Sequence, residues 1–238
     1  WQAAPWRGYG AGAKRVLSQI IGGIDWRAAA GGLFGGGSYG NGSAMRVAPL
    51  AAYFAEDGLE RVAEQAALSA AVTHAHPEGI AGGIAAAVAG AYAWVNRARR
   101  GDAGVKHGLF EAVLTHTPAG EVRDGIERAA GFVFDAPAEP TIRLLDYGAT
   151  TIPFDVSVEP LVRAVGNGSR ISSQDTVPLC LWVAARHLDD YQAALVTAIR
   201  AGGDIDTNAA IVGGIIALAV GPGGIPEDWR SAREGLHH

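Results

Sequence analysis

The chain has 238 residues, of which 49% are hydrophobic and 18% charged, a balance that predicts a compact soluble protein with a large core. A formal net charge of -5 and a sequence pI of about 5.8 argue against a nucleic-acid-binding surface, which needs a basic patch. Cys180 is the only cysteine, so an internal disulfide is excluded. Because no basic-then-apolar signal sequence opens the chain, we expect a cytoplasmic protein that does not bind membranes.

Apolar runs between glycine- and proline-rich breaks predict a succession of helices up to residue 132. The first follows Gly8-Tyr9-Gly10-Ala11-Gly12, which lacks the preceding strand that a nucleotide-binding loop would need. The apolar run at 79–95 falls short of a typical membrane span. The expected helices cover residues 13–21, 43–54, 57–72, 79–95, 106–115 and 122–132.

Two prolines make residues 135–140 a linker, and the chain beyond them again looks helical. We expect helices over residues 141–147, 157–163, 177–186 and 191–200, and a short stretch with strand character at 150–155. Nothing resembles a hairpin, because no alternating pattern or hairpin turn joins two strand-like runs. Regular β-branched runs that would indicate βαβ repeats are also absent. The sequence therefore predicts an all-α fold with a single domain over residues 1–238.

The most informative stretch is Gly202-Gly203-Asp204-Ile205-Asp206-Thr207-Asn208, followed by an apolar run that predicts a buried core helix. The glycine pair permits a sharp turn, and Asp204, Asp206 and Thr207 then lie at the helix N-terminus, where negative charge is favoured. Hard oxygen ligands this close together suit Mg²⁺ or another hard divalent cation. A simple N-cap role for one of the two acids explains the same residues as well.

A second informative stretch is Gly35-Gly36-Gly37-Ser38-Tyr39-Gly40-Asn41-Gly42, which holds too many glycines for a stable helix or strand. Such a loop can turn backbone N–H groups toward one anion, and Ser38 and Asn41 add side-chain donors. The predicted helix after it would direct its positive end to the same place. A flexible loop is the alternative that composition leaves open.

Two histidines, His74 and His76, lie two residues apart between predicted helices, so they cannot share a helix face and make a poor metal pair. The residues alone allow His74 to be either a single ring in a binding site or a buried histidine with satisfied hydrogen bonds. Gly166-Asn167-Gly168 repeats the G-N-G pattern and fits a second wall of a pocket.

Three of these stretches together resemble the ADP-ribosylglycohydrolase family: GGDIDTN at 202–208, GSYGNGSAMR at 37–46 and THAHP at 73–77. Their order and spacing carry the resemblance, which extends over nearly the whole chain. It implies a compact, multi-helix orthogonal bundle with two Mg²⁺ ions, or Mn²⁺ in their place, in a cleft. It also implies a hydrolase that cleaves the glycosidic bond of ADP-ribosylated proteins or small ADP-ribose conjugates. The sequence does not give the oligomeric state, for which we favour a monomer.

The resemblance also implies roles for individual residues. Asp204, Asp206 and Thr207 match the metal ligands, and Asp206 is in addition a candidate catalytic residue. Phe34 falls where an aromatic side chain often packs against the adenine. The positions that match the ADP-ribose-binding loop and the histidine beside it are Gly37, Ser38, Tyr39, Gly40, Asn41, Gly42 and His74.

The sequence departs from the family at one important point. The early metal motif T-D-D-T and the upstream acidic residue used in catalysis do not occur in the 238 residues. Three ligands from one short loop do not fill the coordination of two octahedral magnesium ions. We therefore expect either that an N-terminal segment with the remaining catalytic residues is missing, or that the metal site is incomplete. The second case leaves a non-catalytic ADP-ribose binder, or a crystallin-like structural protein, as the alternative function.

Overall fold

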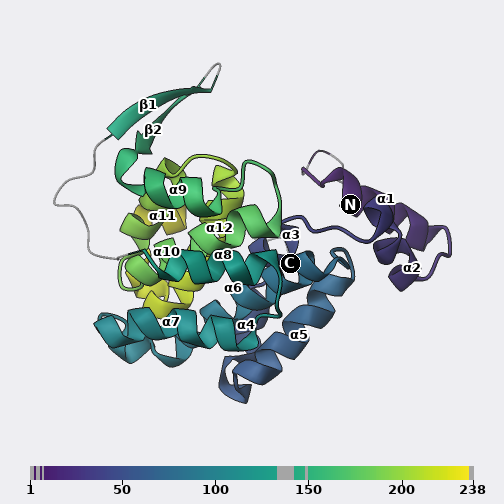
Figure 1. Ribbon diagram of the computed structural model, residues 1–238, viewed down its shortest axis with the longest axis horizontal. Helices are drawn as coiled ribbons and strands as arrows, with labels where there is room; N and C mark the ends of the chain where they lie inside the picture. Colours follow the sequence, from purple (N-terminus) through teal and green to yellow (C-terminus); the bar gives the residue numbers. More distant parts are fainter. Residues whose placement is uncertain (1–2, 4–5, 7, 133–141, 148–149, 236–238) are drawn as a thin grey trace.

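The computed structural model describes residues 3, 6, 8–132, 142–147 and 150–235, and helices make up most of the regular structure in them (Figure 1). The expected all-α fold class is confirmed, with one hairpin as an addition. The longer helices are α1 (Ala11–Ile21), α5 (Leu59–Ala71), α6 (Pro77–Val95), α7 (Ala103–His116), α8 (Glu121–Ala130), α10 (Ser173–Arg186), α11 (Tyr191–Arg200) and α12 (Ile205–Val220). The shorter ones are α2 (Trp26–Gly31), α3 (Gly42–Met45), α4 (Ala48–Phe54), α9 (Glu159–Val165) and α13 (Glu227–Ser231).

Helix α6 lies at the centre of the bundle, where α3, α4, α5, α7, α10 and α12 all contact it. Its alanines and glycines let these neighbours approach closely. At Gly82, for example, an added Cβ would lie 2.5 Å from the Ser173 hydroxyl oxygen. Helix α6 has the length and composition of a candidate membrane span, which the shorter predicted run lacked, yet 72% of its most apolar window is buried inside the bundle. These are also the features of a core helix.

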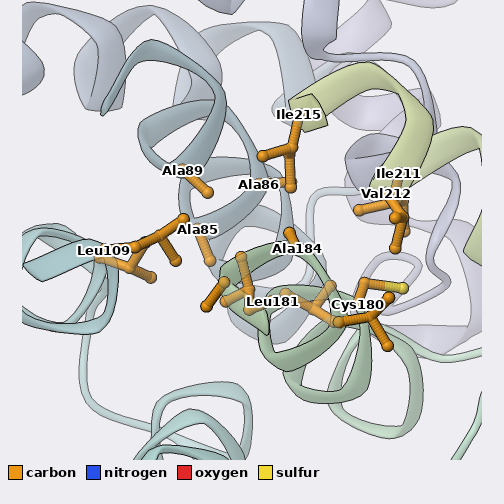
Figure 2. Close-up of a cluster of buried hydrophobic side chains, with 14 of the residues drawn as sticks. Ala85, Ala86, Ala89, Leu109, Cys180, Leu181, Ala184, Ile211, Val212 and Ile215 are labelled. Carbon is orange, nitrogen blue, oxygen red and sulfur yellow. The ribbon is translucent and has the colours of Figure 1, made fainter. Parts of the chain in front are cut away.

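The main core lies between α6, α10 and α12, with α7 closing one side. Cys180 is fully buried there, as expected of a small apolar side chain, and burial raises the pKa of its thiol. Figure 2 shows this cluster of buried side chains, among them Ala85, Ala86, Ala89, Leu109, Cys180, Leu181, Ala184, Ile211, Val212 and Ile215. The core thus fixes α10 and α12, whose N-terminal ends carry the candidate site.

Helices α1 and α2 pack against each other beside the bundle, around a small core of their own (Figure 1). That core consists of Val16, Ala29 and Leu33. Leu33 belongs to the turn that leads into the glycine-rich loop, so this small unit and the loop are continuous in the chain.

An antiparallel strand pair at residues 142–147 and 150–155 contradicts our predictions of a helix at 141–147 and of no hairpin. Strands β1 (Ile142–Tyr147) and β2 (Thr150–Asp155) are antiparallel, with Ile142 paired to Asp155 and Tyr147 to Thr150. The strand character expected at 150–155 is confirmed. Pairing with β2 outweighs the local helix tendency of β1. The predicted linker at 135–140 lies outside the described residues.

Candidate functional site

The acid-bearing bend before α12 is formed as the glycine pair predicts. Gly202 and Gly203 have φ of +70° and +73°, the left-handed region in which glycine is unstrained. An added Cβ at Gly203 would lie 2.1 Å from the Asn167 carbonyl oxygen, so the bend is pressed against the 166–168 turn. That carbonyl accepts hydrogen bonds from the Asp204 N–H (3.3 Å) and from Asn208 Nδ2 (2.8 Å). The second G-N-G turn therefore holds the bend in place through the Asn167 carbonyl.

Asp204 does not act as a simple N-cap. It occupies the N-cap position of α12, but its side chain accepts no hydrogen bond from the first turn of that helix. Its Oδ2 accepts instead from Asn41 Nδ2, at 2.7 Å. Asp206 lies in the first turn with an exposed side chain, and Thr207 is buried. The capping alternative is thus wrong for Asp204, whose carboxylate faces the glycine-rich loop.

Residues 37–42 of the glycine-rich loop are packed closely against residues 74–79. An added Cβ at Gly37 would lie 2.4 Å from the His76 backbone nitrogen, and one at Gly42 would lie 2.9 Å from the His74 ring. On the other side of this contact, an added Cβ at Gly79 would lie 2.4 Å from the Ser38 carbonyl oxygen. These residues are therefore packed against the bundle and do not form a loose surface loop. We call residues 37–42 the cradle.

The start of α10 holds the opposite side of the cradle. Ser173, which is fully buried, donates its N–H to the Tyr39 carbonyl (2.9 Å) and its hydroxyl to the Gly40 carbonyl (3.0 Å). Gly40 and Ser172 form an antiparallel β-bridge. These contacts anchor α10 four residues before its predicted start at 177, so Pro178 lies inside the helix and not in its first turn.

Several backbone N–H groups of the cradle have no acceptor among the described residues. Among the described residues, no acceptor is found for the N–H groups of Ser38, Tyr39 or Gly42. The Gly40 N–H donates to the Ser38 hydroxyl oxygen at 3.2 Å. Successive N–H groups without protein acceptors are characteristic of a nest that binds phosphate oxygens.

His74 borders the cradle as a neutral ring. Its Nδ1 lies 2.7 Å from Thr73 Oγ1, and its Nε2 faces Gly42. Burial, together with the nearby positive charge of Arg46, lowers the pKa of His74 from about 6.5 to about 4. The ring therefore offers hydrogen-bonding nitrogens at neutral pH and no positive charge.

His76 and Tyr39, in contrast, join the cradle to α6. His76 Nδ1 accepts from the Glu78 N–H at the start of that helix, and its ring meets the Tyr39 ring edge-on at 5.3 Å. The two histidines thus have separate partners: His74 borders Gly42, and His76 contacts Tyr39 and the start of α6.

Two strained residues flank the cradle. Phe34 and Ile171 are the non-glycine residues with positive φ among those described, at +54° and +55°, and both side chains are exposed. Strain of this kind costs of order 1–3 kcal/mol and collects at binding sites. Phe34 had been singled out from the sequence, whereas Ile171 had not. A large apolar residue just after the second G-N-G turn was the available signal.

The bend carries three side chains with oxygen donors of the kind that hard divalent cations bind. Asp204 Oδ1 has no hydrogen bond to the described residues, the Asp206 carboxylate is exposed, and the Thr207 hydroxyl meets only Met45 Sδ, a weak acceptor, at 3.8 Å. Two carboxylates and a hydroxyl suit Mg²⁺, which keeps several waters in its shell. Nowhere in the described ranges do three or more His, Cys, Asp or Glu side chains form a group that could hold a metal ion. The described residues therefore contain no group of three such side chains that could bind a second ion.

The comparisons with known proteins identify the family of the chain. The family model for ADP-ribosylglycohydrolase matches residues 1–237. ADP-ribosylhydrolase ARH3 of Homo sapiens is 32% identical over 250 residues, which cover 97% of this chain and 64% of the relative. The Mus musculus protein of the same name is 33% identical over 251 residues, 98% of this chain and 64% of the relative. The chain thus spans less than two thirds of the length of these curated relatives. It belongs to the ADP-ribosylglycohydrolase family.

Proposed function

We propose that the chain provides the ADP-ribose cradle and part of the cation site of a magnesium-dependent hydrolase. The substrates would be ADP-ribosylated proteins or small ADP-ribose conjugates, and the bond cleaved would be the glycosidic bond at the ribose. The observation that carries the proposal is the 2.7 Å hydrogen bond from Asn41 Nδ2 to Asp204 Oδ2, because it joins an anion-binding loop to an acid-bearing bend. Family membership and the name ADP-ribosylhydrolase given to the relatives support ADP-ribose as the ligand.

In this proposal the cradle positions the diphosphate. The N–H groups of Ser38, Tyr39 and Gly42 donate to its oxygens, and the neutral His74 ring adds a hydrogen bond nearby. Phe34 packs against the adenine. Binding energy spent on these remote groups orients the ribose at the bend without itself breaking a bond.

Asp204, Asp206 and Thr207 would hold Mg²⁺, or Mn²⁺, with water or substrate oxygens completing its shell. When bound, the cation supplies Lewis-acid polarisation and lowers the pKa of a bound water. Cleavage at the ribose develops oxocarbenium character at the leaving bond. The exposed Asp206 carboxylate is the candidate acid or base of this chain, and the other catalytic group stays unassigned.

The test has a binding arm and a turnover arm. We expect the chain to bind ADP-ribose with micromolar affinity in calorimetry, more tightly in excess Mg²⁺ than in EDTA. For turnover, release of ADP-ribose from O-acetyl-ADP-ribose and from a modified protein is measured by chromatography. Asp206→Ala should remove any Mg²⁺-dependent release. Asp228→Ala is the matched control, because Asp228 is an exposed acid in the first turn of α13. Absence of ADP-ribose binding would contradict the proposal.

A non-catalytic ADP-ribose binder is the second candidate function. The observation that favours it is the small ligand set at the bend, which suits one cation but not two. Binding of ADP-ribose without turnover, in Mg²⁺ or Mn²⁺, supports this reading, and we expect little turnover from the 238-residue chain alone. Release of ADP-ribose that Asp206→Ala abolishes supports the hydrolase instead.

A further inference from the structure

A buried polar cluster lies between the cradle and the bend, and its centre is the side-chain amide of Asn41. The amide nitrogen donates to Asp204 Oδ2 at 2.7 Å and to Thr176 Oγ1 at 3.0 Å. A carboxylate needs a donor, so the amide must present its NH₂ group on this side. Both of its hydrogens are then used, and the orientation of the amide is fixed by two acceptors from different helices.

The members of this cluster are shielded from solvent to different degrees. Thr176 is fully buried and Asn41 is 4% exposed, whereas Asp204 is partly exposed. Loss of a buried acceptor leaves a donor unsatisfied, which costs more than the bond contributes when it is made. Rotation of the Asn41 amide would remove the partner of the Asp204 carboxylate. The buried hydroxyl of Thr176 therefore helps to determine how a solvent-facing carboxylate is held.

Gly168 makes room for this arrangement. An added Cβ there would lie 2.9 Å from the Asp204 Cβ and 3.2 Å from both Thr176 Oγ1 and Asn208 Oδ1. Its φ of +89° is also in the left-handed region. The side chains of Asn41, Asp204 and Thr176 can therefore meet beside the second G-N-G turn because Gly168 has no side chain.

The cluster is continuous with the cradle. Asn41 lies between Gly40, whose carbonyl is held by Ser173, and Gly42, which contacts the His74 ring. A shift of the cradle on ligand binding would move the Asn41 amide, and with it the donor of Asp204. A cation at Asp204 would act on the same bond from the other end.

We propose that Thr176 is a positioning residue that couples cation binding at Asp204 to ADP-ribose binding in the cradle, through the side chain of Asn41. This inference rests on the proposed function. Thermodynamic linkage requires that the coupling be reciprocal: the cation raises the affinity for ADP-ribose by the factor by which ADP-ribose raises the affinity for the cation. Thr176 is fully buried and would touch neither ligand. In this proposal it acts only through Asn41, so its loss should change the coupling factor.

The test measures the affinity for ADP-ribose in excess Mg²⁺ and in EDTA, by calorimetry, for the wild type and three variants. Thr176→Val keeps the volume and removes the hydroxyl, and it should reduce the Mg²⁺-dependent gain in affinity by about 3- to 10-fold. Thr176→Ser should restore the gain. Thr117→Val is the matched control, because Thr117 is another buried threonine, hydrogen-bonded to the Val113 carbonyl at the end of α7. It should behave as the wild type.

Each outcome decides a separate question. If the wild type does not bind ADP-ribose, the proposed function fails. If it binds but Mg²⁺ brings no gain, or the same gain in Thr176→Val, the coupling is refuted. An equal loss of affinity in Mg²⁺ and in EDTA would show that Thr176 has only a structural role. Should Thr176→Val fail to fold, the side-chain amide resonances of Asn41 in the wild type give the answer by NMR. They must shift with Mg²⁺ alone, and an unchanged spectrum would refute the coupling.

Discussion

The cradle and the bend, the two halves of the candidate site, differ in how firmly the rest of the protein holds them. In the cradle, Gly37 and Gly42 are pressed against residues 74–76, and Ser173 holds the opposite side. At the bend, Asp204 is held by one side-chain hydrogen bond, and Asp206 faces solvent without one to any described residue. Folding alone thus positions the cradle. The bend gathers oxygen donors but leaves their final placement to what binds there, as the Mg²⁺ site that we propose would require, because such sites rely on water and substrate oxygens.

The largest effect should come from breaking the cradle at Gly37. Gly37→Ala forces a left-handed residue to carry a Cβ against the backbone of Ala75 and His76, which cannot move aside cheaply. We expect the free energy of unfolding to fall by about 3–5 kcal/mol, from backbone strain and overpacking together. Chemical denaturation measures the loss.

Gly35→Ala is the matched control for this change. Gly35 has a similar φ, +81°, but an added Cβ meets nothing within 4 Å, so only the left-handed conformation is penalised. About 1–2 kcal/mol should be lost there. Equal losses at the two positions would mean that the cradle is not packed against residues 74–79 in solution.

A drop in pH should distinguish the cradle histidine from a histidine elsewhere. Burial lowers the pKa of His74 and of His187 to about 4, with a smaller contribution from the neighbouring Arg46 and Arg186. Each ring stays neutral in the folded chain while the unfolded chain takes up a proton near pH 6.5. The unfolded state therefore binds more protons below that pH, and stability falls from about pH 6.5 to about pH 4.

At pH 5 the loss should be roughly 2 kcal/mol for each histidine. His74→Gln and His187→Gln should each flatten the dependence of the unfolding free energy on pH between 7 and 5. Only His74→Gln should also change the affinity for ADP-ribose at pH 7. A pH dependence that neither variant alters would exclude both histidines as its source.

The cradle and the bend were recognisable in the sequence, because in each of them glycines and polar side chains lie within a few residues of one another. The link between them was not recognisable, since Asn41 and Asp204 are 163 residues apart and meet only when α10 and α12 pack on α6. Thr176 carried no signal in the sequence, because its partner Asn41 is 135 residues away. The hairpin was missed for a related reason: β1 is a strand because β2 pairs with it.

Of these substitutions, Asp206→Ala should change the free energy of unfolding least. Its side chain is exposed and makes no hydrogen bond to the described residues, so Asp206→Ala should change the unfolding free energy in EDTA by less than about 0.5 kcal/mol. In excess Mg²⁺ the wild type should gain stability by mass action and the variant should gain less. A loss of stability in EDTA would mean that the bend is preorganised like the cradle, which would remove the contrast between the two halves.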